Sequence, residues 1–102
     1  MYLQKELFPS EKDVATISQE LKDVEDWQGL ALWLDIESSI IESNCMREVA
    51  IAECHRRKLV QCYCNTQPHG NPSKIVEDIA KALANMGYKM QAKKLRKLQF
   101  GK

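Results

Sequence analysis

The 102-residue sequence has few glycines and prolines, four and three respectively, and only short runs of β-branched residues. Their scarcity argues against a chain built from many short strands and turns. No hydrophobic run approaches the roughly 20 residues that span a bilayer, and no basic segment precedes an apolar stretch as in a signal peptide. These absences predict a soluble, cytoplasmic chain that makes no membrane contact. The length predicts one domain over residues 1–102 with its core at about 10–98.

The charges present are unevenly distributed along the chain. Residues 1–53 contain 12 acidic and 4 basic side chains, whereas residues 54–102 contain 2 acidic and 11 basic ones. The halves therefore carry −8 and +9, although the net charge of the whole chain is only +1. Such a split indicates a bipolar surface, unless the halves interleave on folding and neutralise each other.

Four cysteines occur, at positions 45, 54, 62 and 64. Without a secretory signal they are expected to be reduced thiols, with Cys45 and Cys54 packed as small buried hydrophobic residues. Cys62 and Cys64 are two positions apart on an expected helix, so they point about 200° from each other and cannot share a metal ion unless the helix ends before Cys64. The sequence therefore predicts no zinc site.

No catalytic motif is present either. Cys54 and His55 are neighbours that a helix would point apart, and no third group is placed to orient them. Phosphate-binding, dinucleotide-binding and metalloprotease motifs are also absent. We expect that the protein is not an enzyme and holds no cofactor.

The spacing of hydrophobic residues predicts helices almost throughout. The expected helices cover about 11–21, 27–34, 37–44, 46–65, 72–86 and 89–98. Ser10 is the expected N-cap of the first, Asn71-Pro72 begins the fifth, and Gly87 ends it in a left-handed conformation. Six short amphipathic helices with brief connections form a bundle.

Each expected helix has an inward-facing stripe. The predicted core residues are Val14, Ile17, Leu21, Trp27, Leu30, Ala31, Leu34, Ile36, Ile40, Ile41, Val49, Ala52, Leu59, Val60, Tyr63, Ile75, Val76, Ile79, Leu83, Met86, Ala92 and Leu95.

Residues 23–36, 59–63 and 79–95 carry patterns that resemble those of death domains. Residues 23–36 are similar to the second helix of that family, in which a tryptophan is followed by Leu-Ala, an apolar residue and isoleucine. Residues 79–95 resemble its last two helices, with an Ala-Leu pair, a glycine between the helices, and alanine and leucine at matching offsets. Leu59-Val60-Gln-Cys-Tyr63 is similar to the Leu-Leu-x-x-Trp of its fourth helix, with tyrosine in place of tryptophan. The resemblance covers about residues 10–98.

The resemblance implies an antiparallel six-helix bundle with a Greek-key arrangement. It also implies a protein–protein interaction module that assembles signalling complexes in apoptosis or innate-immune and inflammatory signalling. Death domains associate with one another through asymmetric pairs of surfaces, and a head-to-tail contact of this kind can propagate. The expected partners are other death-fold domains or further copies of this chain, and no small-molecule substrate is expected.

The resemblance and the charge split together indicate which residues would contact a partner. The predicted acidic surface comprises Asp23, Glu25, Asp26, Asp35 and Glu37. The predicted basic surface comprises Arg56, Arg57, Lys58, Lys89, Lys93 and Arg96, with Tyr88 at the corner between the last two helices. Trp33 lies six positions after Trp27 and about 120° away from the buried stripe. Exposure on a contact surface and packing against a neighbouring helix both remain open for Trp33.

A second functional class is nucleic-acid binding. The basic stretches 56–58 and 93–97 lie on expected helices, and small helical bundles bind DNA. The acidic half would repel a duplex unless it is turned away, and no recognition helix with side chains placed for base edges is evident. Nucleic-acid binding is therefore the alternative to an assembly module.

Overall fold

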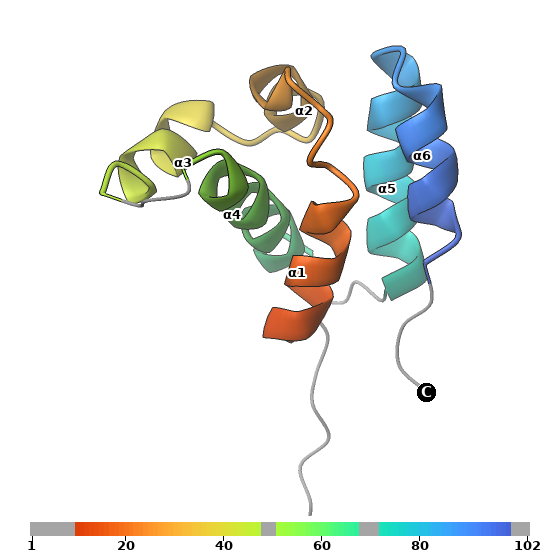
Figure 1. Ribbon diagram of the computed structural model, residues 1–102, viewed down its shortest axis with the longest axis horizontal. Helices are drawn as coiled ribbons and strands as arrows, with labels where there is room; N and C mark the ends of the chain where they lie inside the picture. Colours follow the sequence, from red (N-terminus) through yellow and green to blue (C-terminus); the bar gives the residue numbers. More distant parts are fainter. Residues whose placement is uncertain (1–9, 48–50, 68–71, 99–102) are drawn as a thin grey trace, which may run out of the picture.

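The computed structural model describes residues 10–47, 51–67 and 72–98, and within these ranges the chain is helical and contains no strand (Figure 1). The helices are α1 (Glu11–Gln19), α2 (Trp27–Trp33), α3 (Ser38–Asn44), α4 (Ile51–Asn65), α5 (Pro72–Asn85) and α6 (Lys89–Arg96). The prediction of an all-α bundle with six helices is confirmed for the described ranges. None of these helices is long and apolar enough to cross a membrane.

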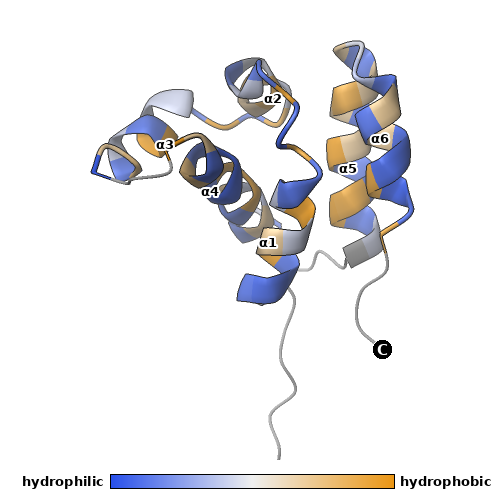
Figure 2. Ribbon diagram, viewed as in Figure 1, coloured by the Kyte–Doolittle hydropathy of each residue, from blue (hydrophilic) through white to orange (hydrophobic). Residues whose placement is uncertain are grey.

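Two pairs of helices form most of the packing. α5 and α6 lie side by side as an antiparallel hairpin, and α1 packs against α4 (Figure 1). The short α2 contacts α3, α4 and α5. The hydrophobic side of α5 faces α1 and α4, whereas the outer side of α6 is hydrophilic (Figure 2). α6 therefore presents a largely polar outer face (Figure 2).

Local sequence explains where α1 begins. The Ser10 hydroxyl accepts a hydrogen bond from the backbone of Asp13 at 3.1 Å, and the Asp13 carboxylate accepts one from the backbone of Ser10 at 3.2 Å. This capping box confirms Ser10 as the N-cap, and such caps typically contribute about 1 kcal/mol. The helix ends at Gln19, two residues earlier than expected, and Leu21 is buried in the connection that follows.

α2 and α5 end in the same way. The backbone N–H of Tyr88 donates to the Leu83 carbonyl at 2.8 Å, and that of Gly87 to the Ala84 carbonyl at 3.1 Å. These two bonds define a Schellman motif, with Gly87 at φ 96° in the left-handed region as predicted. The end of α2 repeats the motif with Asp35 at the left-handed position, at φ 63°. An aspartate tolerates this conformation better than most residues.

Most of the predicted stripe residues form one core. Fully buried large side chains come from α1, α2, α3, α4, α5 and α6, and they include Ile17, Leu30, Ile41, Leu59, Ile79, Leu83 and Leu95. Burying each contributes about 1.5–3 kcal/mol. Ile36 and Met86 are half-buried against this core.

Two core predictions, on α3 and α4, are wrong. Ile40 is 52% exposed because α3 turns only Ile41 inward, and Ala52 is exposed near the start of α4. The predicted start of a helix at Met46 is also wrong, since Met46 lies in the turn after α3. Val49 and the N-cap Asn71 lie outside the described residues.

The expectation of four reduced cysteines is wrong for two of them. Cys45 caps the C-terminus of α3, Cys54 lies in α4, and their sulfur atoms form a disulfide with a Cα–Cα distance of 5.9 Å. Both residues are buried, as predicted, but they face each other because the end of α3 packs against α4. Cys62 and Cys64 are free, and Cys64 is buried. The disulfide therefore fastens α3 to α4.

Candidate interaction surface

The predicted acidic residues lie at the two ends of α2. Asp23, Glu25 and Asp26 are exposed in the α1–α2 connection, and Asp35 and Glu37 are exposed in the α2–α3 connection. None of these carboxylates makes an ion pair within the described residues. Their negative charge is therefore presented to solvent.

Asp26 and Asp35 also have local structural roles. The Asp26 carboxylate accepts the backbone N–H of Gly29 at 3.0 Å and so caps α2. A Cβ at Gly29 would lie 2.4 Å from Asp26 Oδ2, so glycine is the residue that permits this close approach. Asp35 ends α2 at its C-terminus, in the left-handed position of the Schellman motif. The capping bond therefore fixes the Asp26 carboxylate, whereas at Asp35 it is the backbone conformation that ends the helix.

Arg56 is not on the exposed basic surface that was predicted for it. Its side chain is buried, with only 8% of the residue exposed. Its guanidinium donates to the carbonyls of Leu21 at 2.9 Å, of Val24, and of Ala52 at 2.9 Å. It cannot face a partner because it holds the α1–α2 connection against α4. Its spacing could have shown this, since Arg56 lies three, four and seven positions before Leu59, Val60 and Tyr63.

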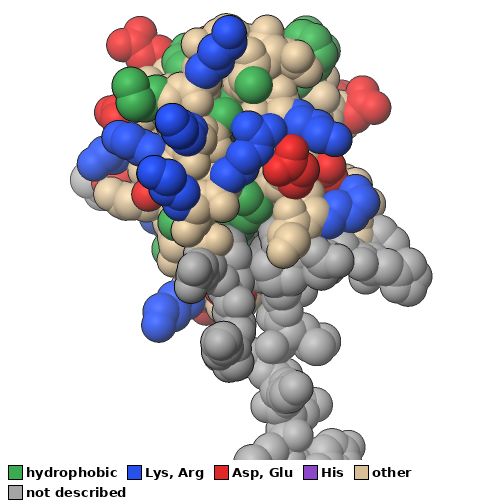
Figure 3. All heavy atoms as spheres, turned by 90° about the vertical axis from the view of Figure 1, so that its right-hand side faces the viewer, with side chains coloured by type: hydrophobic (Ala, Val, Ile, Leu, Met, Phe, Trp, Pro, Cys, Tyr) green, Lys and Arg blue, Asp and Glu red, His purple; other side chains and the backbone are tan. Residues whose placement is uncertain are grey.

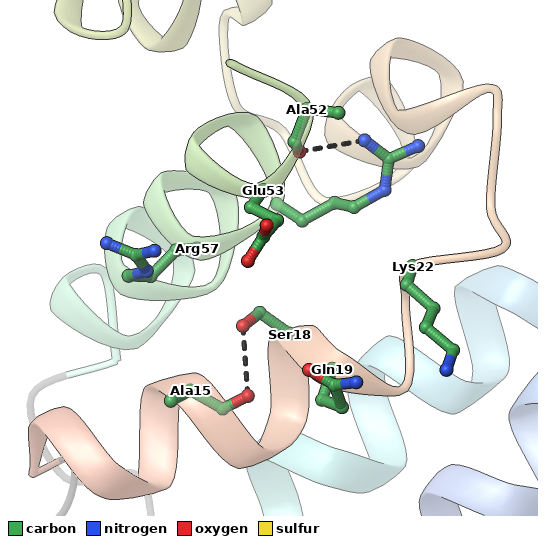
Figure 4. A pocket seen from close by; sticks show the side chains of 8 residues that line it. Ala15, Ser18, Gln19, Lys22, Ala52, Glu53 and Arg57 are labelled. Carbon is green, nitrogen blue, oxygen red and sulfur yellow. Dashed lines mark hydrogen bonds between the residues drawn. The ribbon is translucent and has the colours of Figure 1, made fainter. Parts of the chain in front are cut away.

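The other two basic residues of α4 are more accessible. Arg57 is exposed and Lys58 is half-buried. Arg57 lines a hollow of about 400 Å³ between α1 and α4, together with Lys22 and Glu53 (Figure 4). Glu53 and Ser18 point toward one another across this hollow (Figure 4). The charged side chains are of both signs, so the hollow does not concentrate one charge.

The outer side of α6 is strongly basic. Its exposed residues are Lys89, Lys93, Lys94 and Lys97, and Met90 lies among them with 65% exposure. We call these five residues the lysine face. Figure 3 shows many Lys and Arg side chains spread over the α5–α6 side of the molecule, with acidic side chains among them and at its edges. No lysine of this face makes an ion pair within the part of the chain that the structure describes.

Arg96 differs from these lysines because it is paired. Its guanidinium donates two hydrogen bonds of 3.0 Å to the carboxylate of Glu77 on α5. This pairing lowers the pKa of Glu77 and raises that of Arg96, in both cases chiefly through the hydrogen bonds. Arg96 therefore links α6 to α5 and contributes less unpaired charge to the surface than was predicted.

Trp33 is exposed at the C-terminal end of α2. Trp33 has 56% and Leu32 77% of its surface accessible, so the alternative that Trp33 fills a buried seam is not what the fold adopts. A hollow of about 440 Å³ lies on one side, lined by Leu32, Trp33, Met86, Gly87 and Tyr88. We call it the corner hollow, because it adjoins the α5–α6 corner. The sequence indicated no exposed role for Leu32 or Met90.

Trp33 also borders a second hollow, of about 470 Å³, next to Tyr63 and Asp78. The Tyr63 hydroxyl donates to Asp78 Oδ2 at 2.7 Å, and Lys74 donates to the same oxygen at 2.8 Å. Burial, followed by the hydrogen bond to Asp78, raises the pKa of Tyr63. Burial also opposes ionisation of Asp78, but the bonds from Lys74 and Tyr63 outweigh it and lower the pKa of this carboxyl. This cluster ties α4 to α5.

Tyr88 lies at the α5–α6 corner as expected and is half-buried. Its hydroxyl oxygen accepts the backbone N–H of Asp26 at 3.4 Å, so it joins the corner to the start of α2. The acidic start of α2 and the beginning of the lysine face are therefore brought close together, although 62 residues separate Asp26 from Tyr88.

Among the described residues, Cys54 and His55 do not form a reactive pair. The His55 ring stacks on buried Trp27, with ring centroids 4.4 Å apart, while Cys54 is in the disulfide. Burial raises the pKa of the Cys64 thiol to about 11, which disfavours the reactive thiolate. Among the described residues no group of three or more His, Cys, Asp or Glu could hold a metal ion.

No family model, curated protein or solved structure matches this chain.

Proposed function

We propose that this chain is a protein–protein interaction module of the death-fold type, which assembles signalling complexes by binding further copies of itself or related helical bundles. The observation that carries the proposal is the segregation of unpaired charge on the folded surface. Acidic residues flank α2, lysines cover α6, and neither group is neutralised by the other within the described residues. Two surfaces of opposite charge on one molecule favour association with a second copy.

The proposal includes a Greek-key arrangement of the helices, a role in apoptosis or innate-immune signalling, and a cytoplasmic location. The Cys45–Cys54 disulfide is unusual for a reducing compartment. Its burial supports survival there, since thiol–disulfide exchange requires a thiolate to reach a sulfur atom. A cytoplasmic location therefore requires that the fold keeps thiolates away from the Cys45–Cys54 disulfide.

The experiment is light scattering after size exclusion, at about 50 mM and about 500 mM salt. The test variant is Lys93→Glu with Lys94→Glu, because both lysines are exposed on α6. The control is Lys12→Glu with Arg47→Glu, which changes the net charge equally at exposed sites on α1 and after α3. Arg56 is unsuitable because it is buried. We expect oligomers at low salt that dissociate at high salt and in the test variant but not in the control.

Nucleic-acid binding is the second candidate, and the lysine face favours it (Figure 3). Lysines along a helix neutralise phosphates and give binding that weakens steeply with salt. A mobility shift with an unrelated duplex, lost in the Lys93→Glu, Lys94→Glu variant, would support this function. A wild-type chain that stays monomeric at both salt concentrations and shifts the duplex would overturn self-assembly.

A further inference from the structure

An exposed pair of large hydrophobic residues marks the end of α2. Leu32 and Trp33 are consecutive, with 77% and 56% of their surfaces accessible. The Schellman motif that follows them fixes the end of the helix through the 2.8 Å bond from the Ile36 N–H to the Ala31 carbonyl. Rigid exposed aromatic residues beside hollows are typical of the centres of protein interfaces.

The corner hollow has the shape and lining for a flexible hydrophobic side chain. Leu32, Trp33 and Met86 provide its apolar lining. Gly87 also lines it, and a Cβ there would meet nothing within 4 Å, so the backbone is open on that side. Gly29 and Asp26 complete the lining, with the Asp26 carboxylate against Gly29. A methionine suits such a hollow because its unbranched side chain adapts to irregular spaces.

The negative charges at the two ends of α2 indicate what should surround a side chain that enters the corner hollow. Exposed Asp26 and Asp35 lie at the two ends of α2, and neither forms an ion pair with another described residue. A complementary partner therefore presents a hydrophobic residue between cations.

The lysine face of this same protein meets that requirement. Met90 is 65% exposed, and Lys93 and Lys94 follow it at i+3 and i+4, so the three side chains share one face of α6. Near the α5–α6 corner, at the top of Figure 3, hydrophobic side chains lie beside lysines on the surface.

We propose that the corner hollow of one copy receives Met90 of a second copy, with the lysines beside Met90 facing Asp26 and Asp35. Tyr88 lines the hollow and directly precedes α6, so the receiving and inserting surfaces adjoin. Adjoining complementary surfaces allow a two-fold arrangement in which each copy both receives and inserts. In this two-fold form of the proposal the contact closes at a dimer. This inference rests on the proposed self-association and names its surface.

The experiment is sedimentation equilibrium of the full chain, from about 1 µM to about 1 mM. We expect a monomer–dimer equilibrium with no larger species through this surface. Trp33→Ala and Met90→Glu should each weaken the dimer at least tenfold, as for residues at interface centres. Met46→Ala is the matched control, because Met46 is 76% exposed and lies after α3. Circular dichroism establishes that each variant is folded.

Mixing the two variants identifies the pairing. Trp33→Ala keeps an intact lysine face, and Met90→Glu keeps an intact corner hollow, so their mixture restores one of the two contacts. We expect the mixture to dimerise more strongly than either variant alone. Self-association that neither variant weakens would overturn this surface while leaving the proposed function standing. A wild-type monomer at every concentration would overturn both this surface and the self-association on which it rests, and would leave binding to related helical bundles as the remaining form of the proposed function.

Discussion

The Nε of Arg56 donates a 2.9 Å hydrogen bond to the backbone carbonyl of Leu21, which lies 35 residues earlier in the chain. Leu21 is where the chain leaves α1 and turns toward α2. The guanidinium also binds the carbonyl of Val24, so one side chain from α4 holds both ends of this turn. The buried guanidinium of Arg56 binds backbone carbonyls, so its role is to hold the fold together.

Arg56→Ala should therefore destabilise the fold strongly. The substitution removes the donors from three carbonyls and leaves a cavity, and we expect a loss of about 3 kcal/mol in the free energy of unfolding. Arg57→Ala, one position along at an exposed site, should change it by less than about 0.5 kcal/mol. Urea denaturation monitored by circular dichroism measures both. Equal effects of the two substitutions would contradict the role assigned to Arg56.

Asp35 and Gly87 make a second comparison possible, because they occupy the same position in equivalent motifs. Asp35→Gly should stabilise the protein by about 0.5–1 kcal/mol, since glycine adopts a positive φ without strain. Gly87→Ala should destabilise it by about 1 kcal/mol, although the added Cβ would meet nothing within 4 Å. Thermal unfolding of the two variants tests this. A destabilised Asp35→Gly variant would mean that the carboxylate contributes more than its backbone conformation costs.

Much of the fold could be predicted because the signals are local. The cap at Ser10, the left-handed Gly87 and the helical spacing of buried residues on α5 each depend on a few neighbouring positions. The position of Arg56 was predictable from the same spacing. Its place in a run of three basic residues predicts an exposed patch, but its helical spacing to Leu59, Val60 and Tyr63 places it on the buried side of α4.

Other features depend on how distant segments meet. The disulfide requires that the end of α3 approach α4, which no local pattern encodes. Whether Trp33 is exposed depends on which helices cover α2, and the structure leaves its side uncovered. The unpaired state of the lysine face depends likewise on the acidic residues folding to the ends of α2. These contacts between distant segments determine which residues are exposed and unpaired on the candidate surface.

The Cys45–Cys54 disulfide should contribute substantially to stability. It closes a short loop between residues nine apart, and the entropy removed from the unfolded chain corresponds to about 2–3 kcal/mol. Cys45→Ala with Cys54→Ala should lose about this amount, whereas Cys62→Ala, at a half-buried free cysteine, should lose less. Alkylation of the denatured, unreduced protein followed by mass spectrometry should modify Cys62 and Cys64 only. Modification of all four cysteines would show that the bond is absent.

The Tyr63–Asp78 hydrogen bond should make stability depend on pH at the alkaline end. Burial and the bond to Asp78 raise the folded-state pKa of Tyr63 well above the unfolded value of about 10. A raised folded-state pKa means that the stabilisation is complete below about pH 10 and is lost as the pH rises above it, because the unfolded chain then releases the proton first. Tyr63→Phe should lose about 1 kcal/mol at neutral pH and show a shallower decline above pH 10.

Tyr88→Phe is the matched control for this experiment, because it leaves the Tyr63–Asp78 pair intact and should retain the alkaline decline of the wild type.

Asp78→Asn tests how stability depends on pH at the acid end of the profile. The lowered pKa of Asp78 stabilises the fold above about pH 3.9, and this contribution is lost as the pH falls through the folded-state value. Asp78→Asn should therefore flatten the acid limb of the stability profile. Urea midpoints measured from pH 2 to pH 11 give both limbs, and an unchanged alkaline slope in Tyr63→Phe would mean that the hydroxyl ionises equally well in the folded protein.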